Sequence, residues 1–201
     1  MKHITIESAK LLIVEGKDEE NFFQALLTHI GILDIQILSV GGKTLLPANL
    51  KAVKSTSGFA SVTSLGIVRD ADQDAHAALQ SVKDALAGAG LPSPTSLGQP
   101  VGSSPCVTIE LLPGGFSSGM LEDLCLQSVA SVPLIGCLNQ YLACAQRVSG
   151  TPPQNIAKAQ AYAYLAMQET PGKRIGEAAH SGYWPFTDPA FNGIKAFLRS
   201  L

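Results

Sequence analysis

Three aspartates at alternating positions follow a mostly apolar run near the middle of the chain. The run is Leu65–Arg69, and Asp70, Asp72 and Asp74 come after it. Carboxylate oxygens are the ligands that hard cations such as Mg²⁺ prefer. A short apolar run of this kind is typical of a buried strand, and ligands bind at the carboxyl ends of strands in open α/β sheets. We therefore expect Asp70 and Asp72 at the mouth of a site.

A second acidic segment follows an apolar run near the N-terminus. Residues 11–14 are Leu-Leu-Ile-Val, and Glu15, Lys17 and Glu19 come soon after them. Glu19 follows Glu15 by one helical turn, which places the two acids on the same side of the chain. Because parallel strands end at the same edge of a sheet, we expect the two acidic segments to meet there.

The aspartates do not form a calcium loop. Such a loop beginning at Asp70 requires glycine at its sixth position and a bidentate glutamate at its twelfth. The chain has Ala75 and Ser81 at these positions. Two of the acids also admit structural roles, since Asp72 could cap the following helix and Asp74 could offset its dipole.

A glycine turn is expected between the second strand and the second helix. Gly41, Gly42, Lys43 and Thr44 look like the end of a P-loop, but isoleucine stands at position 37 where that motif has its first glycine. We therefore reject a P-loop. The glycines could still leave backbone N–H groups free to meet an anion at a helix N-terminus. We assign Gly41 and Gly42 to substrate binding.

Strand and helix patterns alternate along the first 130 residues. We expect strands at residues 10–14, 35–40, 65–69 and 106–111, and helices at residues 18–30, 44–54, 72–87 and 120–128. This alternation predicts an α/β fold with a parallel sheet flanked by helices. We divide the chain into an α/β domain at 1–130 and a helical C-terminal extension at 131–201 that packs on it. His180 and Trp184 in the extension are more typical of a packing corner than of a catalytic site.

Residues 88–105 are mostly glycine, proline and serine and cannot build a core of their own. Segments of this length without secondary structure tend to be lids or binding loops, but a mobile surface loop is an equally good interpretation. The sequence leaves both interpretations open.

Charge and cysteine content limit the class of protein. The 201 residues carry a formal net charge of −2. This argues against a broad basic surface for nucleic acid, although Lys43, Lys51 and Lys54 could line a local groove. The four cysteines form no CxxC pair, which indicates reduced thiols. Without a signal peptide or a long apolar segment, we expect a soluble cytoplasmic protein with no membrane partner.

The two acidic segments together resemble the Toprim domain of primases, topoisomerases and overcoming-lysogenization-defect nucleases. In this chain Glu15 ends the first expected strand, and Asp70 follows it by 55 residues. The motifs VEGKDEE, VGGKT, GIVRDADQD and MLEDL, with a Trp-containing C-terminus, look still more like an uncharacterised family of small stand-alone prokaryotic Toprim-like proteins. The resemblance covers about residues 8–128 by motif. It implies a Toprim-like, Rossmann-like fold.

The resemblance implies a role for each matching residue. Glu15 matches the Toprim glutamate, which acts as a general acid/base or as a metal ligand. Asp70 and Asp72 match the pair that holds Mg²⁺, for which Mn²⁺ can substitute. Glu19 matches a second acid that the nuclease branch uses for another metal ion, and Glu122 matches a later acid of that branch.

These matches imply a Mg²⁺-dependent enzyme that processes phosphodiesters, of nuclease or nucleotidyl-transfer type, with nucleic acid as its partner. A cation would stabilise the negative charge that develops during cleavage, and the candidates are Lys17, Lys43 and Lys173. We take Lys43 for catalysis and Lys17 for substrate binding. The alternative is a non-catalytic, metal-binding adaptor for nucleic acid or a protein. Low basicity and the lack of an attached ATPase or helicase domain favour the adaptor.

Overall fold

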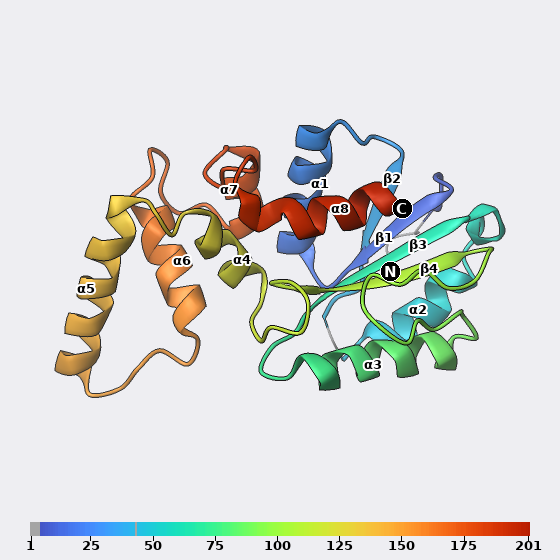
Figure 1. The fold of residues 1–201 in the computed structure, drawn as a ribbon, viewed down its shortest axis with the longest axis horizontal. Helices are drawn as coiled ribbons and strands as arrows, with labels where there is room; N and C mark the ends of the chain where they lie inside the picture. The colour runs from blue at the N-terminus through green and yellow to red at the C-terminus, as the bar shows by residue number, and fades with distance from the viewer. Residues whose placement is uncertain (1–4, 43) are drawn as a thin grey trace.

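Four parallel strands form the central sheet among the residues that the structure describes. The structure is a computed structural model, and it describes residues 5–42 and 44–201 (Figure 1). The strands are β1 (Lys10–Val14), β2 (Ile35–Ser39), β3 (Ser64–Asp70) and β4 (Cys106–Leu112), in the order β2-β1-β3-β4. All three neighbouring pairs are parallel. This confirms the α/β class with a parallel sheet flanked by helices.

Helices cover both faces of the sheet. They are α1 (Lys17–Ile30), α2 (Leu46–Lys54), α3 (Ala75–Gly88), α4 (Leu121–Ser128), α5 (Pro133–Ser149), α6 (Ile156–Ala166), α7 (Ile175–His180) and α8 (Asn192–Ser200), with 3₁₀ turns at Phe59–Ser61 and Pro189–Phe191. Figure 1 shows α2 and α3 on one side of the sheet and α1 and α8 on the other. None of the described helices has the length and apolar composition that a membrane span requires.

The strands are mostly apolar because both faces of the sheet are covered. In β1, Leu11 and Ile13 pack in the core with α2 and α3, whereas Leu12 and Val14 pack in the core with α1 and α8. Side chains alternate between the faces of a strand, so an unbroken apolar run supplies two cores at once.

The C-terminal elements pack into the second of these cores. Helix α7 lies against α1 at Gly176, where a Cβ would clash with the backbone of Asp18. Trp184 is buried and its indole N–H donates to the carbonyl oxygen of Ile175 at 3.1 Å. The expectation of a packing corner is thus confirmed for Trp184. Helix α8 crosses the sheet at Gly66.

The expected start of the third helix is wrong. Residues 72–74 are not helical, and α3 begins at Ala75. Asp72 has a positive φ of 54° and forms an antiparallel bridge with Gly119, which removes it from the helix. Asp74 caps α3 instead, because its carboxylate accepts from the backbone N–H groups of His76 and Ala77. The second helix also begins later than expected, at Leu46.

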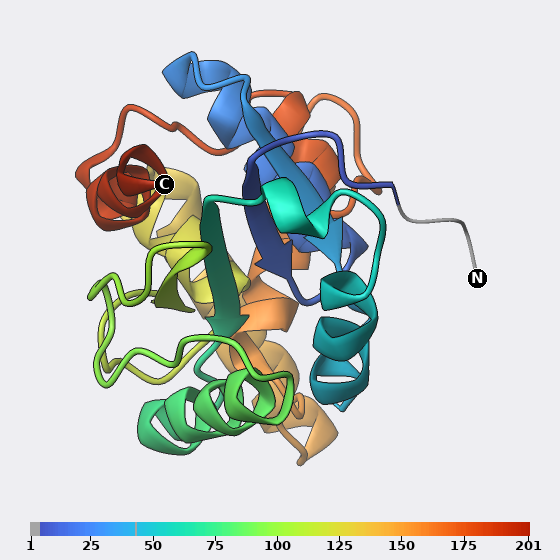
Figure 2. The same ribbon diagram turned by 90° about the vertical axis from the view of Figure 1, so that its right-hand side faces the viewer.

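The glycine- and proline-rich segment at residues 88–105 runs along the outer edge of β4. Val101 and Val107 exchange two backbone hydrogen bonds of 2.9 and 2.8 Å, and the N–H of Gly98 donates to the carbonyl oxygen of Ile109. Figure 2 shows this segment beside the edge strand. An uncovered edge is a template for aggregation, so the segment has a protective role that the sequence pattern did not reveal.

Candidate functional site

Acidic side chains from separate elements gather at the carboxyl edge of the sheet. Glu15 follows β1, Asp70 ends β3, and Glu19 and Glu122 lie in the first turns of α1 and α4. Burial raises the pKa of Asp70 to about 8, and the negative charges of Glu15, Glu19 and Glu122 add to this rise. Burial also raises the pKa of Glu19, with contributions from Asp18 and Glu122. The structure therefore brings these acids into one electrostatic cluster.

Glu15 has a positively charged neighbour that the sequence analysis missed. Its Oε1 lies 3.3 Å from Nε of Arg69, and the two side chains are 19% and 8% exposed. Glu15 Oε1 and the Nε and Nη1 atoms of Arg69 are buried without a hydrogen bond, so the contact is an ion pair of poor hydrogen-bond geometry. Burial raises the pKa of Glu15 although Arg69 opposes the rise. Arg69 is a charged residue next to a run of apolar residues in β3, and this feature of the sequence could have pointed to it.

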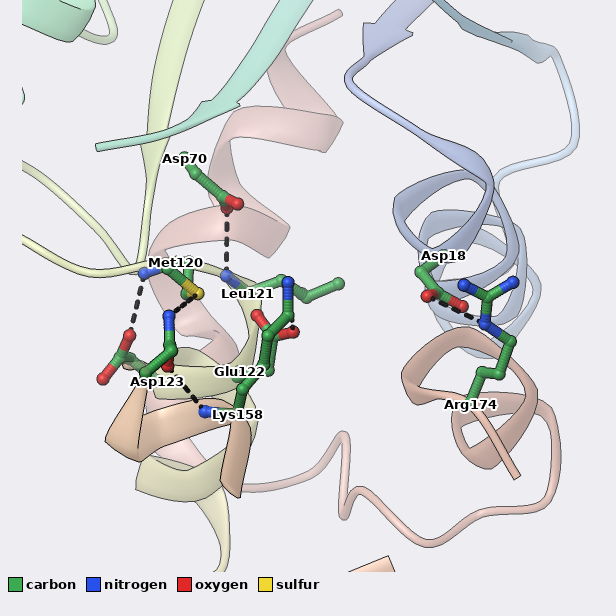
Figure 3. Close-up of polar contacts among 9 residues, drawn as sticks. Asp18, Asp70, Met120, Leu121, Glu122, Asp123, Lys158 and Arg174 are labelled. Carbon is green, nitrogen blue, oxygen red and sulfur yellow. Dashed lines mark hydrogen bonds and ion pairs between the residues drawn. The ribbon is translucent and has the colours of Figure 1, made fainter. Parts of the chain in front are cut away.

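The start of α4 fixes the position of Asp70. The carboxylate of Asp70 accepts from the backbone N–H of Leu121 at 3.0 Å, and that of Asp123 accepts from the N–H of Met120 at 2.9 Å (Figure 3). Glu122, in the same turn, lies 3.6 Å from Nζ of Lys158 in α6. The end of β3 and the start of α4 thus meet at Asp70, and α6 contacts the same turn of α4 through Glu122.

Asp72 lies at the same edge in an unusual backbone conformation. It is the one residue other than glycine with positive φ among the described residues. Its N–H and carbonyl oxygen pair with Gly119 at 2.8 and 2.7 Å, which holds the conformation in place. Such strained positions cluster at functional sites. The negative charge of Asp72 also raises the pKa of Glu15, so Asp72 belongs to the acidic cluster.

A surface hollow of about 520 Å³ opens beside Asp72. It is lined by Arg69, Ala71, Asp72, Gln73, Asp74, Ala77 and Ala78. Near it, the rings of His76 and Phe116 stack with centroids 4.5 Å apart and planes at 16°. His76 is exposed and Phe116 is 49% exposed. The hollow shares Arg69 and Asp72 with the acidic cluster, whereas Asp70, Glu15, Glu19 and Glu122 are not among its lining residues.

The residues assigned to substrate binding have other partners in the structure. Lys17 pairs with Glu20 at 2.6 Å and is largely exposed. The N–H of Gly42 donates to the carbonyl oxygen of Glu15 at 2.8 Å, so it is not free for an anion. Gly41 and Gly42 both have positive φ and form a turn, but they lie before the first residues of α2 rather than at its N-terminus. Lys43 lies outside the described residues.

Residues 9–201 match a family described as "Protein of unknown function (DUF3226)". The chain belongs to this family. Nothing among the curated proteins matches it. A solved structure, the hypothetical protein PH0156 from Pyrococcus horikoshii OT3, resembles this DUF3226 protein with a TM-score of 0.63 and 16% identity, over 95% of this chain and 94% of the other. At this identity the likeness extends to the fold alone.

The acids of this DUF3226 protein do not form a finished metal cage. Within the described residues, no group of three or more His, Cys, Asp or Glu side chains is arranged to hold a metal ion. Arg69 pairs with Glu15, and Lys158 pairs with Glu122. Asp70 accepts a hydrogen bond from the N–H of Leu121 and has no cationic partner among the described residues, and burial together with the neighbouring negative charges raises its pKa. The acids at this edge of the sheet can thus bind a cation or hold a proton.

Proposed function

We propose that this DUF3226 protein is a Mg²⁺-dependent phosphodiester-processing enzyme of nuclease or nucleotidyl-transfer type, with a Toprim-like arrangement of its site. The observation that carries the proposal is the raised pKa of Asp70, about 8, inside a cluster with Glu15, Glu19 and Glu122. Acids from separate elements that lie close enough to raise one another's pKa are typical of functional sites.

The donor set suits Mg²⁺ or Mn²⁺. Mg²⁺ binds through one or two carboxylates and keeps several waters, so it does not need a complete protein cage. Asp70 and Asp72 would hold the ion, with Glu19 and Glu122 as candidates for a second position. When bound, the ion would neutralise these carboxylates and polarise a phosphodiester oxygen. The buried Glu15 Oε1, which lacks a hydrogen bond, fits a site that a further group completes.

The protein's own residues suggest a division of roles. Burial raises the pKa of Glu15 above its ordinary value, and a raised pKa suits a carboxylate that accepts and returns a proton. The guanidinium of Arg69 lies beside Glu15, where it would stabilise negative charge on a phosphate. We therefore propose that Arg69, rather than Lys43, is the cation that acts at this site. The N–H of Leu121 orients Asp70.

Nucleic acid is the favoured substrate because of the aromatic pair. The stacked rings of His76 and Phe116 are accessible at the edge that carries Asp72. Bases that are not paired in a duplex stack on such rings, and this interaction tolerates any sequence. Single-stranded or nicked DNA or RNA would expose such bases.

The second candidate is the non-catalytic adaptor. It is favoured by the internal ion pairs of Glu15 and Glu122, which already neutralise two of the acids. An adaptor would bind nucleic acid or a protein at this edge without turnover.

Cleavage assays separate the two candidates. We expect the wild type to cut single-stranded or nicked DNA or RNA only with Mg²⁺ or Mn²⁺. Glu15→Gln and Asp72→Asn should each lower the rate by about 10²-fold or more, since each removes a charged group but keeps its shape. Asparagine also tolerates the positive φ at position 72. Thermal melts should show that both variants remain folded.

The matched control is Asp84→Asn, an exposed acid of α3 that accepts from Gln80. It should leave the rate unchanged. If the wild type binds Mg²⁺ but shows no turnover on a panel of nucleic acids and nucleotides, and the variants keep the same nucleic-acid affinity, the enzyme is excluded and the adaptor is supported.

A further inference from the structure

A second hollow, here called the β4 pocket, opens beside the outer strand of the sheet. Its volume is about 430 Å³, which lies within the range of small-molecule sites. Three segments that are far apart in the sequence wall it: residues 97–98, the turn after β4 at residues 113–115, and the start of α8 with the residues before it. Figure 2 shows α8 and the segment at 88–105 on the same side of the molecule. None of the clustered acids is among the residues that line this pocket.

Glu110 of β4 is the one charged residue in the wall of the pocket among the described residues. Side chains alternate along a strand, and its neighbours Ile109 and Leu111 belong to the core with α2 and α3, so Glu110 faces the side of α8. Its carboxylate is half-buried and accepts from the N–H of Leu111 at 3.1 Å.

Glu110 forms no ion pair with any described residue. Burial raises the pKa of its carboxyl group, although the backbone N–H groups of Leu111 and Gly115 oppose the rise. Removal of a carboxylate from water is unfavourable unless a partner of opposite charge compensates for it. The charge that would complement this pocket is therefore positive.

The rest of the wall offers apolar groups and bare backbone. Aliphatic side chains come from Leu97, Leu112 and Ile194. Four glycines also line the pocket: Gly98, Gly114, Gly115 and Gly193. A Cβ added to any of these glycines would have no atom within 4 Å, so the space beside them is open. This lining suits the apolar body of a ligand and leaves Glu110 as its one ionic contact.

Hydrogen bonds hold one wall of the pocket in place. The N–H of Gly98 donates to the carbonyl oxygen of Ile109 at 2.9 Å, which fixes the segment at 88–105 against β4. Within this segment, Oε1 of Gln99 accepts from the hydroxyl groups of Thr95 and Ser96, both at 3.0 Å. These contacts favour a binding loop over a mobile surface loop, the two interpretations that the sequence left open.

We propose that the β4 pocket binds a small organic cation, an ammonium group on an apolar body, with Glu110 as its counter-ion. The ammonium group donates to the carboxylate, and hydrogen bonds between charged groups are stronger than those between neutral ones. The apolar body lies against Leu97, Leu112 and Ile194. A ligand of about ten non-hydrogen atoms should bind with a Kd of about 0.1–1 mM. The proposal does not depend on the function proposed for the acidic edge.

A titration of the full chain with 2-phenylethylammonium chloride tests the proposal. The four pocket glycines report on binding, because the backbone amide signals of glycine occupy their own region of a proton–nitrogen NMR spectrum. Their signals should shift as the ligand is added, whereas those of Gly31 and Gly172, which are not in the pocket wall, should stay in place. The neutral analogue 2-phenylethanol should bind at least about tenfold more weakly, because it lacks the charge.

Two variants separate charge from shape. Glu110→Gln keeps the shape of the side chain but removes its charge, and it should weaken binding of the ammonium probe by about tenfold or more. Gly193→Leu keeps the charge but narrows the pocket, and it should also weaken binding; leucine favours a helix more than glycine does, so α8 should remain folded. The matched control is Glu169→Gln, which removes an exposed acid outside the pocket and should bind like the wild type. Thermal melts check the fold of each variant.

Any of three results would overturn the proposal. The first is a wild type whose pocket glycines do not shift with the ammonium probe in large excess over the expected Kd. The second is equal binding of the probe by the wild type and folded Glu110→Gln, or equal binding of the alcohol, since the charge would then contribute nothing. The third is a shift of the same signals by Mg²⁺ but not by the ammonium probe, which would make the pocket a metal site.

Discussion

At the scale of single residues, the position of Arg69 gives Glu15 a positively charged neighbour. Its guanidinium lies beside Glu15, with both side chains largely buried. Among the described residues Asp70 has no such neighbour, and it accepts one backbone hydrogen bond. Burial and the remaining negative charges raise its pKa to about 8. Asp70 therefore holds a proton at neutral pH when no metal ion is present.

Asp70→Asn should change how stability depends on pH. The folded pKa of Asp70, about 8, lies above its ordinary value of 3.8. The native state then binds more protons than the unfolded state between these values, so the free energy of unfolding falls as pH rises through the window. The full shift corresponds to on the order of 5 kcal/mol. The variant should lose this dependence and exceed the wild type in melting temperature at pH 9 in chelator. Parallel melting curves of the two proteins from pH 5 to 9 would contradict the assignment.

At the scale of elements, the connection from β4 to α4 positions the site. Gly119 in this connection pairs with Asp72, and the next residue begins the cap of α4 through Asp123. Gly119 has a φ of 133°, and a Cβ there would lie 2.8 Å from Asp123 Oδ2 and 3.1 Å from Pro113 Cδ. This position has room for glycine alone.

Gly119→Ala should therefore destabilise the protein by about 1–3 kcal/mol through backbone strain and the close contact with Asp123. Gly136→Ala is the matched control, because Gly136 lies in α5 with nothing within 4 Å of its would-be Cβ. This second variant should gain about 0.5–1 kcal/mol, since alanine loses less backbone freedom than glycine in a helix. Urea unfolding of both variants checks the pair. A Gly119→Ala variant as stable as the wild type would show that the fold does not depend on glycine at this position.

At the scale of the whole molecule, the C-terminal part completes the core of the sheet. Trp184, Phe191 and Phe197 are buried in the same core as Leu12 and Val68 of the sheet. The side of the sheet that carries α1 is therefore covered by segments far apart in the sequence.

A fragment of residues 1–130 should not fold on its own, although it contains every strand and every residue of the acidic cluster. Removal of the C-terminal part would expose one face of the sheet to water, and burial of a large side chain such as Trp184 is worth about 3–5 kcal/mol by itself. We expect weak chemical-shift dispersion in its proton NMR spectrum and no cooperative melt, in contrast to the full chain. A cooperative transition in the fragment would establish 1–130 as an independent domain.

The sequence by itself determined the elements and their order. Apolar runs such as Leu11–Val14 and the helical spacing after Lys17 are local patterns, because a residue's position on a strand or helix depends on its near neighbours. The expectation that Glu15, Asp70 and Asp72 meet also came from the sequence, since parallel strands end at one edge. The shift of the start of α3 to Ala75 came from a distant partner, Gly119.

The tertiary structure alone decided the charge balance of the site and the role of the segments between the elements. The pairing of Arg69 with Glu15 joins two strands, and that of Lys158 with Glu122 joins two helices. The segment at 88–105 covers an exposed strand edge, which exists only because β4 is the outer strand of the sheet. Ion pairs, burial and pKa depend on distances between residues that are far apart in the chain. No local pattern contains those distances, because they arise when the elements pack.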